Sequence, residues 1–152
     1  MSTTPDYTAY EAKRAAMTSL EAEILPRNKT ALFDALAGAG IATVIVRFDG
    51  CGDSGQIESI DAYGRGNTEV GLPATTVTMS EVTFDGPTVT AEPRNPRDAI
   101  ETMAYAFLEQ THDGWENDDG AYGEFIFDVA ERSITLDYNE RYTLTNCHQH
   151  EF

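Results

Sequence analysis

Ile41-Ala-Thr-Val-Ile-Val-Arg-Phe48 is the stretch that decides the fold. Its even-numbered positions from 42 to 48 are all apolar, while the odd-numbered positions between them include Thr43 and Arg47. Alternation with a period of two is typical of a β-strand that buries one face. The stretch therefore predicts a strand that supplies part of an apolar core.

The forty residues before this strand predict two helices. Apolar side chains recur there at helical spacing, at Tyr10, Met17, Leu20 and Ile24. Pro26 interrupts the pattern, because proline inside a helix removes a backbone hydrogen bond. We expect one helix to end near Leu25. A second helix would begin around Pro26–Asn28 and stop at Gly38-Ala39-Gly40.

Strand and turn signals alternate after Phe48. The segment Asp49–Gly55 predicts a turn, because three of its seven residues are glycine. A strand over Gln56–Tyr63 follows, and its apolar residues Ile57 and Ile60 lie three apart instead of two. That spacing indicates a β-bulge.

A polar, glycine-rich loop over residues 63–73 leads to two further predicted strands. These strands are Thr75–Phe84 and Thr88–Ala91. Asp85-Gly86-Pro87 between them is a suitable hairpin turn.

Asn95-Pro96 opens the best-marked helix of the chain. Asparagine is a favourable N-cap, and proline fits the first helical position. A buried stripe follows at helical spacing, formed by Ile100, Met103, Ala104, Phe107 and Leu108. We expect this helix to end near His112.

Two alternating segments, Tyr122–Ala130 and Ser133–Tyr142, complete the predicted elements. The resulting order, ααββββαββ, favours an α+β fold with an antiparallel sheet of about five to six strands and helices packed on one face. The 152 residues are the size of a single domain. Residues 143–152 are expected to form a mobile tail.

Bulk composition is that of an ordinary soluble protein. Hydrophobic residues make up 41% of the chain, which suffices for a core. Cys51 and Cys147 show no disulfide framework spacing, so reduced thiols are expected. The start Met1–Asp6 lacks the pattern of a secretory signal, and no apolar run is long enough to span a bilayer. We therefore expect a cytoplasmic protein without a membrane partner.

Acidity dominates the chain, whose formal net charge is −16. Between Arg97 and Arg132 lie ten carboxylates and no Lys or Arg. Direct binding of nucleic acid is not expected, because phosphate contacts require basic side chains. Such acidity favours a basic protein surface or a divalent cation as the partner. It can also serve solubility alone, or reflect a salt-rich habitat.

An acidic protein-binding module is the leading functional hypothesis. Its carboxylates would imitate a phosphate backbone, or neutralise the groove of a basic nucleic-acid-handling protein, as an inhibitor, anti-defence factor or immunity protein would. The expected partner-binding residues are Glu109, Asp113, Trp115, Glu116, Asp118, Asp119 and Glu124. Trp115 would be an interface anchor if exposed, and otherwise it would pack against the sheet.

A divalent metal site is the alternative. Two acidic glycine turns supply the carboxylates Asp49, Asp53, Asp118 and Asp119. Ca²⁺ or Mg²⁺ would be the ion, since hard cations prefer oxygen ligands. Convergence of these turns would allow a metal-dependent hydrolase. The tail residues 147–151 also hold potential zinc ligands, but structural zinc needs ligands from at least two segments.

No catalytic residue is assigned from the sequence, and an enzyme is the less favoured class. Gly52-Asp53-Ser54-Gly55 spells the segment around the nucleophile of chymotrypsin-like proteases. The chain is too short for that fold, and its three histidines lie at a helix end and in the tail. Turn formation explains the tetrapeptide.

The run Trp115-Glu-Asn-Asp-Asp-Gly-Ala-Tyr-Gly123, within the segment Gly114–Tyr142, is distinctive. Together with Phe48–Glu58 it resembles a family of small acidic bacterial and plasmid-borne proteins of unknown function. The resemblance implies no activity. A plasmid setting would favour a counter-defence or regulatory role.

Overall fold

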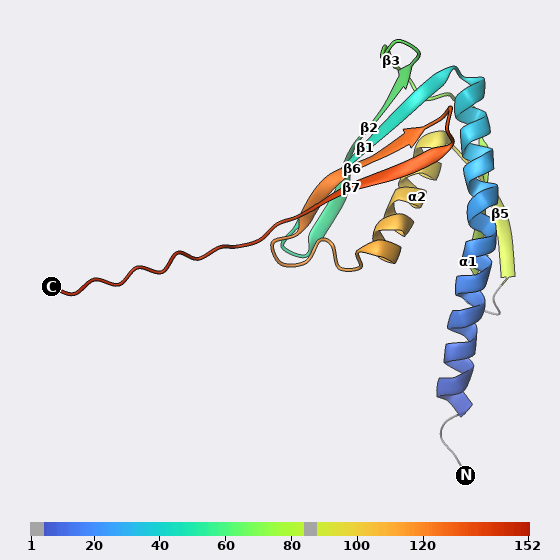
Figure 1. The fold of residues 1–152 in the computed structure, drawn as a ribbon. Coiled ribbons are helices and arrows are strands. Elements are labelled where there is room, and N and C mark those ends of the chain that lie inside the picture. Colours follow the sequence, from blue (N-terminus) through green and yellow to red (C-terminus); the bar gives the residue numbers. More distant parts are fainter. Residues whose placement is uncertain (1–4, 84–87) are drawn as a thin grey trace.

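The computed structural model describes residues 5–83 and 88–152. A five-stranded antiparallel sheet forms its centre, in the order β3-β2-β1-β6-β7 (Figure 1). The strands of this sheet are β1 (Ile41–Cys51), β2 (Ser54–Gly64), β3 (Glu69–Val70), β6 (Ala121–Asp128) and β7 (Ser133–Glu140). With two helices and a separate hairpin, this arrangement confirms the predicted α+β class.

The predicted strand over residues 41–48 is the centre of the sheet. Val44, Val46 and Phe48 are buried, whereas Arg47 on the other face is exposed. The predicted bulge in β2 is confirmed, because Arg47 pairs with Ser59 and Phe48 pairs with Ile57. Glu58 is the extra residue between these two pairs.

One continuous helix, α1 (Pro5–Gly38), replaces the two helices predicted for the N-terminal region. Pro26 lies inside it, so the expectation of a helix boundary there was wrong. The helix continues because residues on both sides of the proline are held by packing: Ile24, Leu32 and Phe33 are all buried. Tertiary burial outweighs the single backbone hydrogen bond that proline removes. Among the described residues, neither helix is long and apolar enough to cross a membrane.

A hairpin of β4 (Val77–Thr83) and β5 (Thr88–Arg94) forms a second, two-stranded sheet beside α1. Asn28 of α1, only 7% exposed, joins the helix to this hairpin. Its side-chain amide donates to the carbonyl of Ser80 (3.0 Å) and accepts from the Ser80 amide (2.8 Å). This pair satisfies both backbone groups of Ser80 on β4. The predicted turn at residues 85–87 lies outside the described residues.

The second helix, α2 (Pro96–Thr111), matches its prediction closely. The Asn95 side chain accepts a hydrogen bond from the Asp98 amide (2.8 Å), which is the expected N-cap. Ile100, Ala104 and Leu108 are fully buried in the same core cluster as the inner face of β1. The other face of the sheet carries polar residues such as Arg47, which makes a salt bridge with Asp61.

After β7, residues 141–152 have no regular secondary structure. Figure 1 shows this segment running out from the sheet and away from both helices. Its first residues still contact the body, as described below. Leu144 and Phe152 are strongly exposed.

Candidate functional site

A recess of about 430 Å³ lies at the end of the sheet where the α2–β6 loop meets the end of β7. Four carboxylates line it, together with aromatic rings and one guanidinium group. Its lining side chains are His112, Asp113, Trp115, Asn117, Asp118, Asp119, Tyr138, Glu140, Arg141 and Tyr142. The recess therefore combines negative charge with flat apolar surfaces.

Backbone hydrogen bonds fix the loop that forms one wall of the recess. The amides of Gly52 and Asp53, in the β1–β2 turn, donate to the carbonyls of Asp118 and Glu116, each at 3.0 Å. The loop is also closed internally, since the Gly120 amide donates to the Asn117 carbonyl at 2.9 Å. The two acidic glycine turns that the sequence singled out thus lie against each other.

Trp115 anchors this loop to the sheet. Its ring lies on two glycines, because a Cβ atom built at Gly50 or Gly55 would approach ring carbons at 2.6 or 2.5 Å. The ring also meets Phe48 edge-on, with centroids 5.5 Å apart. Only 7% of Trp115 is exposed, so the hypothesis of an exposed interface anchor was wrong and the packing alternative holds.

Stacked rings form a second wall. His112, which follows α2, lies parallel to Tyr138 of β7, with centroids 3.6 Å apart and an interplanar angle of 4°. Tyr138 also stacks on Phe48 at 6.2 Å. Burial raises the pKa of the Tyr138 hydroxyl, and the charges of Glu140 and Glu116 raise it further. Both effects disfavour the ionised form of the Tyr138 hydroxyl.

Among the described residues, Arg141 is the only Lys or Arg that lines the recess, and its charge is already engaged. Its guanidinium donates to both carboxylate oxygens of Asp49, at 2.9 and 3.1 Å, and to the Gly50 carbonyl at 3.1 Å. It also lies over the Tyr122 ring, 4.7 Å from the centroid. The hydrogen bond to Asp49 raises the pKa of Arg141 above its usual value. Within the part of the chain that the structure describes, the four lining carboxylates thus face no unengaged Lys or Arg in the recess.

The structure brings together part of the predicted partner-binding set. Asp113, Asp118 and Asp119 are exposed and share the recess. Glu109 is exposed in the last turn of α2, and Glu116 is half-buried beside the Trp115 seat. These five acids therefore belong to one short stretch at one end of the sheet.

Glu124 does not join them. It lies on β6, where it pairs with Arg47 at 3.6 Å on the sheet face opposite the core. Alternation along a strand explains the separation, since Phe125 next to it is buried.

The four predicted metal ligands are divided among three environments. Asp118 and Asp119 line the recess, while Asp49 is held by Arg141. Asp53 is exposed in the β1–β2 turn. Across residues 5–83 and 88–152, no group of three or more His, Cys, Asp or Glu side chains is arranged to hold a metal ion. A metal site stays a prediction from the sequence.

Glu140, Arg141 and Tyr138 are site residues that sequence reasoning missed. The register of the β6–β7 hairpin is the feature that could have revealed them. Pairing Asp128 with Ser133 across a short turn leads, step by step, to a pair between Ala121 and Glu140. This register brings the end of β7 beside the α2–β6 loop, although the two segments lie some twenty residues apart.

Comparison with known proteins places the chain in a family without assigning an activity. Neither the curated proteins nor the solved structures gave a match. A family model matches residues 24–152, which include both walls of the recess and the C-terminal segment. On that match, the chain belongs to a family of unknown function, DUF6878.

Proposed function

We propose that the protein is an acidic protein-binding module that holds basic side chains of a partner in the recess between the α2–β6 loop and β7. The observation that carries this proposal is the convergence of Asp113, Asp118, Asp119 and Glu140 on one recess. A basic protein surface is the complement of such a site, because opposite potentials attract and orient the two partners.

The walls suit an arginine or lysine side chain in particular. A guanidinium can donate two parallel hydrogen bonds to a carboxylate, and its plane can lie on an aromatic ring. The stacked pair of His112 and Tyr138 supplies such a ring beside the carboxylates.

Rigidity supports the same function. Trp115 and the hydrogen bonds from Gly52 and Asp53 hold the acidic loop in one place before a partner arrives. A site that is already ordered loses less conformational entropy on binding. A solvating acidic surface has no need of a loop fixed in this way.

The partner class follows from the charge pattern. Basic grooves that contact phosphate are found on nucleic-acid-handling proteins, and closely spaced carboxylates can occupy them in place of phosphates. Asp113, Asp118 and Asp119, with Glu109 and Glu116 beside them, supply five acids within the eleven residues 109–119. An inhibitor of such a protein, of the anti-defence or immunity type, is the form of the function that we favour.

Affinity purification with the full chain as bait tests this proposal. One bait variant would carry Asp113→Asn, Asp118→Asn and Asp119→Asn. Asparagine suits position 118, where φ is +57°, because it tolerates left-handed backbone better than most residues. We expect the unmodified bait to retain a basic nucleic-acid-handling protein that high salt releases.

The matched control carries Glu11→Gln, Glu21→Gln and Glu23→Gln, three exposed positions of α1 that do not line the recess. Both variants lose three negative charges, so any general effect of net charge is the same. The proposal requires the recess variant to lose the partner and the α1 variant to keep it. Equal retention by both variants would contradict it.

A further inference from the structure

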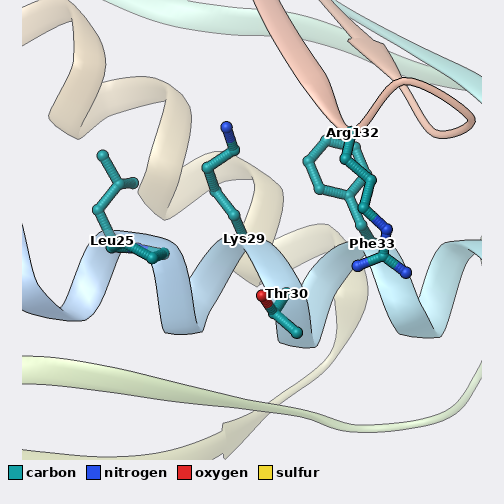
Figure 2. Close-up of a pocket in the computed structure, with 6 residues that line it drawn as sticks. Leu25, Lys29, Thr30, Phe33 and Arg132 are labelled. Carbon is teal, nitrogen blue, oxygen red and sulfur yellow. The ribbon is translucent and has the colours of Figure 1, made fainter.

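A second hollow, of about 370 Å³, lies between α1 and the turn that joins β6 to β7. Figure 2 shows Leu25, Lys29 and Phe33 rising from the same side of the helix, with Arg132 of the turn beside the Phe33 ring. Its lining residues are Leu25, Pro26, Lys29, Thr30, Phe33 and Arg132. The volume is within the range of sites for small molecules.

The base of the hollow, called its floor below, is formed by one side of α1. Leu25, Lys29 and Phe33 are four residues apart, so they form one ridge along α1. Phe33 is fully buried and packs against Phe127 of β6, with ring centroids 6.2 Å apart. The floor is therefore a fixed part of the core, and a bound apolar group would be shielded from water on that side.

Two cationic groups stand at this floor. Lys29 is half-buried, and no described residue gives it a hydrogen bond or an ion pair. The chain has only 10 Lys and Arg residues against 26 Asp and Glu, so two cations at one apolar hollow run against its overall charge.

Arg132 is the second cation, and it is placed by an unusual backbone. Its φ is +53°, a conformation that glycine or asparagine adopts more readily than arginine. Its guanidinium donates to Asp34 at 2.5 Å. Both side chains of that pair are about half exposed, so water and salt weaken the pair and leave the guanidinium able to accept a second anion as a partner.

We propose that this hollow binds a small amphipathic anion, a carboxylate that carries an aliphatic chain. Lys29 and Arg132 would attract the carboxylate, because ammonium and guanidinium groups donate charge-assisted hydrogen bonds to carboxylate oxygens. The aliphatic chain would cover Leu25 and Pro26, which are not fully buried. This site is separate from the acidic recess and has the opposite charge preference.

Octanoate is the probe, titrated into the ¹⁵N-labelled full chain, with calorimetry for the affinity. We expect shifts of backbone signals concentrated around residues 25–33 and 132. Octylamine, with the same chain length and a positive head group, should bind at least tenfold more weakly, as should acetate, which has no chain. Equal binding of octylamine would overturn the proposal.

Lys29→Gln tests the charged end of the site, and Arg27→Gln is its matched control. Arg27 is exposed on the same turn of α1 but does not line the hollow. We expect Lys29→Gln to weaken octanoate binding about tenfold or more, the effect of one charge-assisted hydrogen bond, and Arg27→Gln to change it less than twofold. Equal weakening by both variants would contradict a specific site.

A second variant, Arg132→Gly, removes the other cation while relieving the left-handed backbone. It should fold normally and bind octanoate at least several-fold more weakly. Unchanged affinity in a folded Arg132→Gly variant would also overturn the proposal.

Discussion

The acidic recess and the α1 hollow are similar in volume, about 430 and 370 Å³, but they are built in different ways. The recess depends on loops, which Trp115 and backbone hydrogen bonds hold against the sheet. The hollow depends on a helix ridge whose Phe33 belongs to the core. A net charge of −16 therefore does not make every surface of this protein equivalent.

Because the two sites are built from different elements, a substitution that disrupts one site should leave the other intact. Substitutions that loosen the α2–β6 loop should remove the recess and spare the hollow, because no lining residue is shared between them. The following changes test that separation, beginning with the largest expected effect.

Trp115→Ala should destabilise the protein by about 3–5 kcal/mol, the usual range for removing a buried tryptophan. The cavity would open directly over Gly50 and Gly55, where the ring now lies. Urea unfolding monitored by circular dichroism measures the loss. If the variant remains folded without denaturant, octanoate binding at the hollow should persist. A loss below about 1 kcal/mol would show that the loop does not depend on this side chain.

Gly120→Ala should lower the free energy of unfolding by roughly 3 kcal/mol, because backbone strain and overpacking both act at this position. The residue has a φ of +75°, and a Cβ atom there would lie 1.7 Å from the Gly50 carbonyl oxygen. Gly52→Ala is the control, since its φ is also positive (+59°) but nothing lies within 4 Å of the added atom. That variant should lose only about 1 kcal/mol. Equal losses in thermal unfolding would contradict the close approach of the two turns.

Ionisation of Tyr138 should have the smallest effect on the stability of the fold, and this effect should be visible only at high pH. Its pKa is raised in the folded protein, chiefly by burial, so the folded state holds the hydroxyl proton more tightly than the unfolded state. This contribution to stability is fully present below the ordinary tyrosine pKa of about 10, and it is lost as pH rises through the folded pKa. Absorbance at 295 nm against pH measures the titration, and Tyr138→Phe identifies its signal. Glu140→Gln should lower the pKa; an unchanged value would exclude the charge effect.

Much of the fold could be predicted because local signals agreed with tertiary packing. Asn95 as N-cap, the buried stripe of α2 and the alternation in β1 each specify an element without help from distant residues. The same holds for the bulge at Glu58, which the spacing of two isoleucines revealed. Pro26 was misleading because its local cost is outweighed by burial of the helix on both sides.

The candidate site was less predictable because it depends on contacts between distant segments. The acids of the α2–β6 loop could be named from charge alone. The seat of Trp115 on Gly50 and Gly55 could not, since these residues are some sixty positions away in sequence. Likewise, nothing near Arg141 in the sequence indicates that it binds Asp49, 92 residues away.

The most direct test of the acidic recess is to find which residues of the chain contact a bound basic peptide. The ¹⁵N-labelled full chain would be titrated with a short arginine-rich peptide, and the shifts of assigned backbone signals would be mapped. We predict the largest shifts at residues 112–120 and 138–142, with weaker binding as salt increases. Shifts spread evenly over all exposed acids, including Glu11, Glu21 and Glu23 of α1, would contradict a specific site and leave the charge with a solvating role.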